Sequence, residues 1–103
     1  MFHMLEDTEL WHFHMGAPLV IHQIADGEIH SSILGSRLDG TERLFLPIPP
    51  GRWFAAESTG NYSLVGCTVV PGFEFERFRL GTFAELSPLA PSHSSLIRRL
   101  TPS

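Results

Sequence analysis

Turn-forming residues recur at short intervals along this chain, and short apolar segments fill the intervals between them. Glycine, proline, asparagine and aspartate favour turns because they adopt or impose backbone angles that regular strands avoid. Short strands separated by frequent turns are typical of β-sandwiches and β-barrels. The sequence therefore predicts an all-β fold with turns at Gly16, Asp26-Gly27, Asp39-Gly40, Pro49-Pro50-Gly51, Gly60-Asn61 and Pro71-Gly72.

The apolar segments between these turns are the predicted strands. Asp26-Gly27 suits a tight hairpin turn because both residues tolerate a positive φ. Alternation in the last segment is interrupted at Glu76-Arg77, which indicates a bulge. The predicted strands are Leu10–His14, Leu19–Ile24, Glu28–Leu34, Arg43–Ile48, Arg52–Ala56, Tyr62–Val70 and Phe73–Leu80.

The C-terminal residues follow a helical pattern instead. Ser92 is a residue type that caps helices, and Leu96, Ile97 and Leu100 recur on one helical face. We therefore expect one short helix between Ser92 and Leu100.

Composition limits the function classes. A length of 103 residues predicts a single domain, and a net charge of −4 without a basic patch argues against a nucleic-acid partner. The chain has no apolar run long enough to cross a membrane, and its start lacks the layout of a secretory signal. The single cysteine, Cys67, excludes an intramolecular disulfide, so we expect a soluble cytoplasmic protein.

Two segments together resemble a known family. The first is ELWHFHMG at residues 9–16, followed by Pro18 and Leu19. The second runs from PGRW at residues 50–53 through Ala55-Ala56 to LVGCTVVPGFEF at residues 64–75. Their order and spacing resemble the DUF985 family, also called Cupin_5, of the cupin superfamily, over nearly the whole chain.

The resemblance implies a cupin double-stranded β-helix, or jelly roll, with an internal pocket and usually a dimeric assembly. It also implies a fold similar to RmlC-like sugar epimerases, but the family has no common reaction to transfer. Family members carry an N-terminal helix and first strands before the point that matches His3. We therefore expect residues 1–103 to form a single cupin domain without those elements, and a homodimer in which exchanged strands are one way to cover an open edge.

The resemblance also bears on metal binding, because many cupins hold a divalent metal with three histidines and a glutamate. Glu9 and Gly16 fit the end of the first cupin motif, and His3 stands near the position of its histidine pair. Phe54 occupies the histidine position of the second motif and cannot ligate a metal. At most two of the four ligands remain, so we expect no tightly bound cofactor and at most a weakly held divalent metal.

His12 and His14 form a separate pair that could reach one metal ion, because residues two apart in a strand share a face. The same alternation places Glu9, Trp11 and Phe13 on the opposite face. We favour half-buried, hydrogen-bonded histidines that point away from the interior, although a bulge in the strand would reverse this. The isolated histidines are expected at the surface or at an interface: His22, His30 and His93.

Glu9, Trp11 and Phe13 are the better candidates for a ligand pocket, with Trp53 and Phe54 of the second motif predicted to close it. A carboxylate beside aromatic rings can orient a polar ring by stacking and hydrogen bonding. The alternatives are an aromatic core without a ligand and a salt bridge between Glu9 and an arginine. Cys67 is expected to be a buried, unreactive thiol.

Three functions remain open. The first is a non-catalytic module that binds a small polar or carbohydrate-like molecule. The second is a metal-independent sugar epimerase or isomerase in which His3 and Glu9 exchange protons with the substrate. The third is a degenerate cupin that serves only in assembly.

Overall fold

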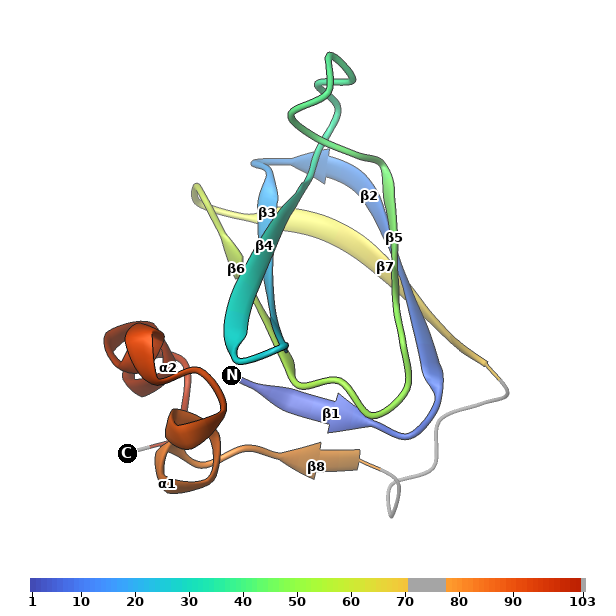
Figure 1. The fold of residues 1–103 in the computed structure, drawn as a ribbon. Coiled ribbons are helices and arrows are strands. Elements are labelled where there is room, and N and C mark those ends of the chain that lie inside the picture. Colours follow the sequence, from blue (N-terminus) through green and yellow to red (C-terminus); the bar gives the residue numbers. More distant parts are fainter. Residues whose placement is uncertain (71–77, 103) are drawn as a thin grey trace.

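The computed structural model describes residues 1–70 and 78–102 of the chain. Its strands are β1 (His3–Leu5), β2 (Thr8–Gly16), β3 (Leu19–Ala25), β4 (Glu28–Leu34), β5 (Phe45–Ile48), β6 (Phe54–Ser58), β7 (Ser63–Val70) and β8 (Phe78–Leu80). They are followed by helix α1 (Phe83–Leu86), the 3₁₀ turns η2 (Ser87–Leu89) and η3 (Pro91–His93), and helix α2 (Ser94–Arg99). The fold is therefore mostly β with short C-terminal helices (Figure 1).

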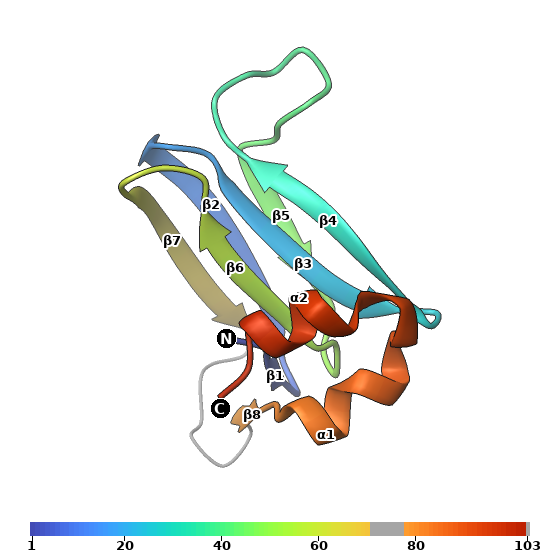
Figure 2. The same cartoon turned by 90° about the vertical axis from the view of Figure 1, so that its left-hand side faces the viewer.

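The strands form two antiparallel sheets. The five-stranded sheet has the order β4-β3-β6-β1-β8, and the three-stranded sheet has the order β5-β2-β7. Helix α2 lies across the outside of the five-stranded sheet, over β3 and β6 (Figure 2). The two sheets face each other, because residues from both contribute to one buried cluster.

The β3–β4 hairpin confirms the predicted turn. Asp26 has a φ of 55° and Gly27 a φ of 77°, and the strands pair in register from Leu19 with Leu34 to Ala25 with Glu28. Two consecutive residues of positive φ give a turn whose twist matches that of antiparallel strands.

Buried apolar residues form two clusters on opposite faces of the five-stranded sheet. The inner core lies between the sheets and contains Leu19, Ile21, Leu34, Leu46, Ile48 and Phe54. The helix-side core lies beneath the C-terminal helices and contains Phe2, Met4, Ile24, Trp53, Ala55, Leu86, Ala90 and Ile97. Alternation along each strand sends neighbouring residues to different cores.

Several element boundaries differ from the predictions. β1 was not predicted, because three residues are too few to show a period. The Ser92 cap is wrong: Ser92 lies in η3, and α2 begins at Ser94 after His93 without a side-chain cap. The predicted bulge at Glu76-Arg77 lies outside the described residues.

Helix α1 was also not predicted. Thr82 caps it, because its hydroxyl accepts a hydrogen bond from the backbone N–H of Glu85 at 3.2 Å. No helix in residues 1–70 and 78–102 has the length and hydropathy needed to cross a membrane.

Candidate functional site

Glu9 lies on the inner face of β2, between Ile48 of β5 and Val69 of β7. Only 6% of its surface is exposed. Its Oε2 atom is buried without a hydrogen-bond partner in the described part of the chain, so the alternative of a salt bridge with a described arginine does not apply. A buried carboxylate oxygen in this state is unfavourable unless something else satisfies it.

Trp11 lies two residues further along the same face, opposite Leu46 and Cys67. Its Nε1 is the second buried polar atom here without a partner among the described residues. The indole meets the Phe54 ring edge to face, with ring centroids 5.9 Å apart. The strand therefore places one unused acceptor and one unused donor next to an aromatic wall.

His3 reaches the same wall from β1. It pairs in register with Phe54, and the two ring centroids are 4.2 Å apart. Burial lowers the pKa of His3, an effect opposed by its hydrogen bond to the Met1 carbonyl. This bond, 3.0 Å long, places the proton of the neutral ring on Nδ1.

The same surroundings act on Glu9 and Cys67. Burial raises the pKa of the Glu9 carboxyl, and donors from Cys67 and Trp11 near the carboxylate oppose this increase. The Trp11 N–H does not reach hydrogen-bond geometry, so it remains available as a donor. Partial desolvation and the charge of Glu9 raise the pKa of the Cys67 thiol to about 11. Cys67 is nevertheless exposed, which corrects its predicted buried position.

The predicted pocket residues are only partly brought together. Phe13 packs against the inner core on the same face as Glu9 and Trp11. The placement of Trp53 is a correction: it lies in the helix-side core with Leu86, and Arg79 lies over its ring at 5.1 Å. Trp53 immediately precedes β6 and Phe54 is its first residue, and their side chains lie on opposite faces of the sheet.

The histidine pair lies on the other face of the three-stranded sheet. His12 contacts Phe45, with ring centroids 5.2 Å apart, and the His14 ring lies over Gly66. A register shift occurs between Phe13 and Met15, but it does not turn His14 inward.

The four metal candidates are therefore divided between two faces. His3 and Glu9 lie on inner faces, whereas His12 and His14 lie on the outer face of the three-stranded sheet. Within the described ranges, no group of three or more ligating side chains is close enough to hold a metal.

Gln23 and Arg52 were not identified from the sequence. Gln23 is buried on the inner face of β3, opposite Phe54, and its Oε1 accepts a hydrogen bond of 3.2 Å from Arg52. Both side chains therefore bring polar groups to the inner face near the Phe54 ring. The signal was the position of Gln23 within an apolar strand, two residues after the buried Ile21.

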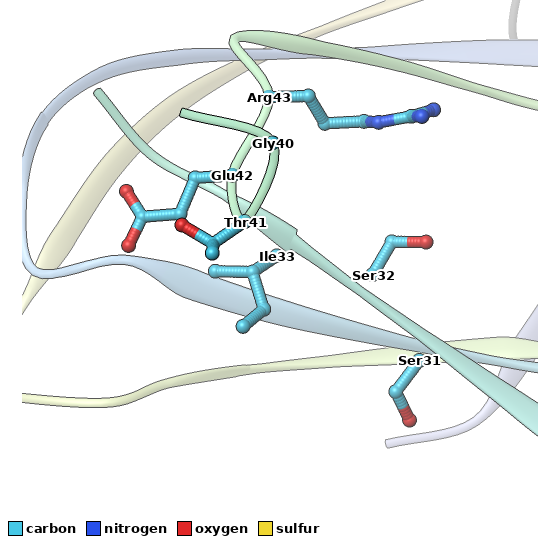
Figure 3. A pocket seen from close by; sticks show the side chains of 7 residues that line it. All are labelled: Ser31, Ser32, Ile33, Gly40, Thr41, Glu42 and Arg43. Atoms are coloured by element: carbon cyan, nitrogen blue, oxygen red, sulfur yellow. The ribbon is translucent and has the colours of Figure 1, made fainter. Parts of the chain in front are cut away.

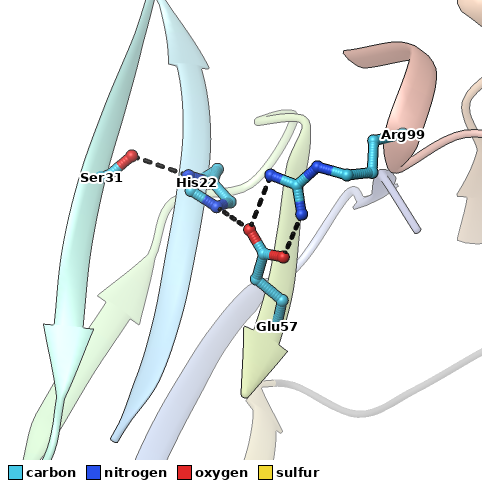
Figure 4. A network of polar contacts seen from close by, with 4 residues as sticks. All are labelled: His22, Ser31, Glu57 and Arg99. Atoms are coloured by element: carbon cyan, nitrogen blue, oxygen red, sulfur yellow. Dashed lines mark hydrogen bonds and ion pairs between the residues drawn. The ribbon is translucent and has the colours of Figure 1, made fainter. Parts of the chain in front are cut away.

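A second polar group lies on the opposite face of the five-stranded sheet (Figure 4). His22 Nδ1 is 2.7 Å from the Ser31 hydroxyl, and His22 Nε2 is 2.7 Å from Glu57 Oε2. Arg99 of α2 donates to both oxygens of the same carboxylate. His22 is thus buried in a network, which corrects its predicted surface position.

The hydrogen bonds to Arg99 and His22 lower the pKa of Glu57. The carboxylate is therefore ionised and accepts a hydrogen bond from His22 Nε2, while His22 Nδ1 is hydrogen-bonded to the Ser31 hydroxyl. Glu57 joins α2 to β3, β4 and β6 through this network.

Comparison with known proteins places the chain among relatives of known structure. Protein SO0799 from Shewanella oneidensis is similar over 98% of this chain and 65% of its own, with 36% identity and a TM-score of 0.90. A hypothetical protein from Leishmania major is similar over 99% of this chain and 68% of its own, with 28% identity and a TM-score of 0.86. No curated protein is similar enough to count as a match.

The family comparison agrees with the resemblance found in the sequence. The model of the cupin superfamily family DUF985 matches residues 1–81, which is more than half of the chain. This match includes all five residues predicted for the pocket and leaves only the C-terminal helices outside. The chain therefore belongs to the Cupin_5 (DUF985) family of the cupin superfamily.

Proposed function

We propose that this protein binds a small polar, carbohydrate-like molecule on the inner face of β2, and that its two sheets are the layers of a cupin jelly roll. The observation that carries this proposal is a pair of buried atoms, Glu9 Oε2 and Trp11 Nε1, for which the described residues supply no hydrogen-bond partner. The two residues are two positions apart on one face of β2; the carboxylate oxygen accepts a hydrogen bond and the indole N–H donates one.

The free-energy cost of these atoms supports a ligand. A buried polar group without a hydrogen bond destabilises a fold by about 1–3 kcal/mol. A hydroxyl of a bound molecule would donate to Glu9, and a second oxygen of that molecule would accept from Trp11. Molecules with several hydroxyls on one ring, such as sugars, carry both groups at short spacing.

The aromatic rings supply the apolar part of the interaction. The Trp11 and Phe54 rings meet edge to face, and the His3 ring lies against Phe54. Rings in this arrangement favour the C–H face of a sugar, while the carboxylate orients its hydroxyls. The polar edge and the apolar wall together favour a sugar-like ligand over a fully apolar one.

A thermal-shift screen against monosaccharides and nucleotide sugars tests the proposal. A ligand that binds only the folded protein raises Tm, and above Kd the stabilisation grows with the logarithm of the ligand concentration. We expect at least one sugar to raise Tm in a concentration-dependent way. We expect Glu9→Gln to weaken this effect, because an amide cannot replace the charged acceptor. Trp11→Phe should also weaken it, because the indole N–H donor is lost while an aromatic ring remains.

His12→Gln is the matched control, because His12 lies on the same strand but on the outer face. This variant should bind as the wild type does. If no sugar raises Tm, or if Glu9→Gln and His12→Gln bind equally well, the pocket assignment fails. A folded protein without any ligand would then support the assembly-only role.

Opposite pKa shifts favour a second candidate, a metal-independent sugar isomerase or epimerase. Burial lowers the pKa of His3 and raises that of Glu9, which suits a base and an acid on one inner surface. His3 would remove a proton from a carbon next to a carbonyl, and Glu9 would return a proton to that carbon from the opposite face. Incorporation of solvent deuterium into a bound sugar, lost in both His3→Gln and Glu9→Gln, is the test.

A further inference from the structure

A pocket of about 380 Å³ lies away from Glu9, at the seam between the two sheets (Figure 3). One wall of the pocket is β4, the edge strand of the five-stranded sheet. The other wall is the loop that leads to β5, which is the edge strand of the three-stranded sheet. Its volume is within the range of small-molecule sites. The lining residues are Ser31, Ser32, Ile33, Gly40, Thr41, Glu42 and Arg43.

Arg43 is the cation of this pocket, and no described residue neutralises it. Within residues 1–70 and 78–102, Arg43 forms no ion pair, whereas Arg79 and Arg99 each pair with a glutamate. Ser32 likewise has no hydrogen-bond partner for its hydroxyl within these ranges, while the Ser31 hydroxyl is engaged with His22. The guanidinium and one hydroxyl are therefore both available to a ligand.

The neighbouring carboxylate is held away from Arg43. Glu42 Oε1 accepts a hydrogen bond of 2.9 Å from the Arg37 backbone N–H. It also lies against Gly35, where an added Cβ would come within 2.2 Å of the same oxygen. In Figure 3, Arg43 and Ser32 extend to one side of the loop and the Glu42 carboxylate extends to the other.

The backbone of the loop fixes this arrangement. The Arg43 N–H donates to the Ile33 carbonyl at 2.9 Å, and the Gly35 N–H donates to the Arg43 carbonyl at 3.0 Å. Both hydrogen bonds join backbone atoms, so the loop is held to β4 without any contribution from the Arg43 side chain. A substitution of that side chain therefore leaves the pocket wall in place.

We propose that this seam pocket binds the oxyanion group, a carboxylate or a phosphate, of a small metabolite through Arg43 and Ser32. A guanidinium offers two parallel N–H donors to such a group, and an adjacent hydroxyl adds a third. Ile33 gives the pocket an apolar wall, which suits a ligand with a short carbon skeleton. The site is independent of the inner face around Glu9.

Nuclear magnetic resonance titration of the ¹⁵N-labelled full chain tests the proposal, with succinate and inorganic phosphate in separate series at constant ionic strength. We expect saturable shifts of the amides of residues 31–33 and 40–43 with at least one probe. The probe that binds more tightly identifies which oxyanion the pocket prefers. Arg43→Gln should weaken binding by about tenfold or more, as expected for the loss of a charge-assisted contact.

Arg37→Gln is the matched control, because Arg37 belongs to the same loop and carries the same charge but does not line the pocket. It should bind as the wild type does, and Ser32→Ala should show an intermediate loss. A dispersed amide spectrum of Arg43→Gln verifies its fold. The proposal is overturned if neither probe gives saturable shifts, or if Arg37→Gln and Arg43→Gln lose binding equally.

Discussion

The carboxyl group of Glu9 sits where ionisation is unfavourable, because burial raises its pKa above the ordinary value. A raised pKa in the folded state means that Glu9 favours folding while it is protonated, and that this contribution is lost as the pH rises through the folded pKa. We expect Glu9→Gln to gain stability relative to wild type as the pH rises from about 4 to 7. Urea unfolding of both proteins across this range measures the difference.

Glu57→Gln serves as the control, because its stability relative to wild type should change with pH in the opposite direction. The pKa of Glu57 is lowered, so its stabilising effect is present above the unfolded pKa and disappears as the pH falls. An identical pH dependence of the two variants relative to wild type would contradict both assignments.

Cys67 combines partial exposure with a thiol pKa of about 11. Because only the thiolate is nucleophilic, we expect iodoacetamide at pH 8 to alkylate the native protein roughly a hundredfold more slowly than the urea-unfolded chain. Glu9→Gln should accelerate the native reaction by removing the nearby negative charge. Mass spectrometry of timed samples measures the rates, and equal rates for native and unfolded protein would exclude a raised thiol pKa.

At the scale of residues, strand alternation predicted which side chains share a face with Glu9. Trp11 and Phe13 follow it at intervals of two, and the structure places all three on one inner face. The Trp53 prediction failed because two adjacent residues cannot both face the interior of one strand. The sequence could not predict that Glu9 Oε2 and Trp11 Nε1 lack hydrogen-bond partners among the described residues, because this depends on which polar groups the facing sheet presents.

Among the elements, α2 depends on the Glu57 network for its polar attachment to the sheet. Glu57→Gln removes the charged acceptor shared by Arg99 and His22, and we expect it to lower the free energy of unfolding by about 1 kcal/mol. Glu28→Gln is the control, because Glu28 pairs with His93 but is 57% exposed. Equal losses in the two variants would argue against a special role for the Glu57 network.

The elements with strong local signals were predictable. β3 and β4 follow from two apolar segments joined by Asp26-Gly27, whose backbone angles the turn requires. β1 and α1 were missed because their three and four residues do not complete a second period of the strand or helix pattern, so no repeat is visible in the sequence. The start of α2 was misplaced because Ser92, although a favoured cap residue, lies in a separate 3₁₀ turn.

For the whole molecule, the outer face of the three-stranded sheet carries exposed apolar side chains beside His12 and His14. Phe45, Met15 and Leu64 are 45%, 53% and 51% exposed there, and no described helix covers them. A sheet face of this kind favours association, and we propose that it forms the contact of a homodimer. Light scattering coupled to size-exclusion chromatography should give twice the chain mass at micromolar concentration.

Leu64→Arg should shift this equilibrium to the monomer, because it places a charge within the apolar contact. Leu38→Arg is the control, since Leu38 is 63% exposed in the loop between β4 and β5. A monomeric wild type, or a dimer that tolerates Leu64→Arg, would rule out this contact.

Trp53 and Phe54 have a consequence for how this chain can change. They are neighbours in sequence, but one fills the helix-side core and the other the inner core. Losing or gaining a single residue at Pro49–Arg52 would exchange the two rings and drive an indole into space shaped for a phenyl group. Insertions are usually tolerated in surface turns, yet at this turn the length of the chain is as strictly determined as the identity of a buried side chain.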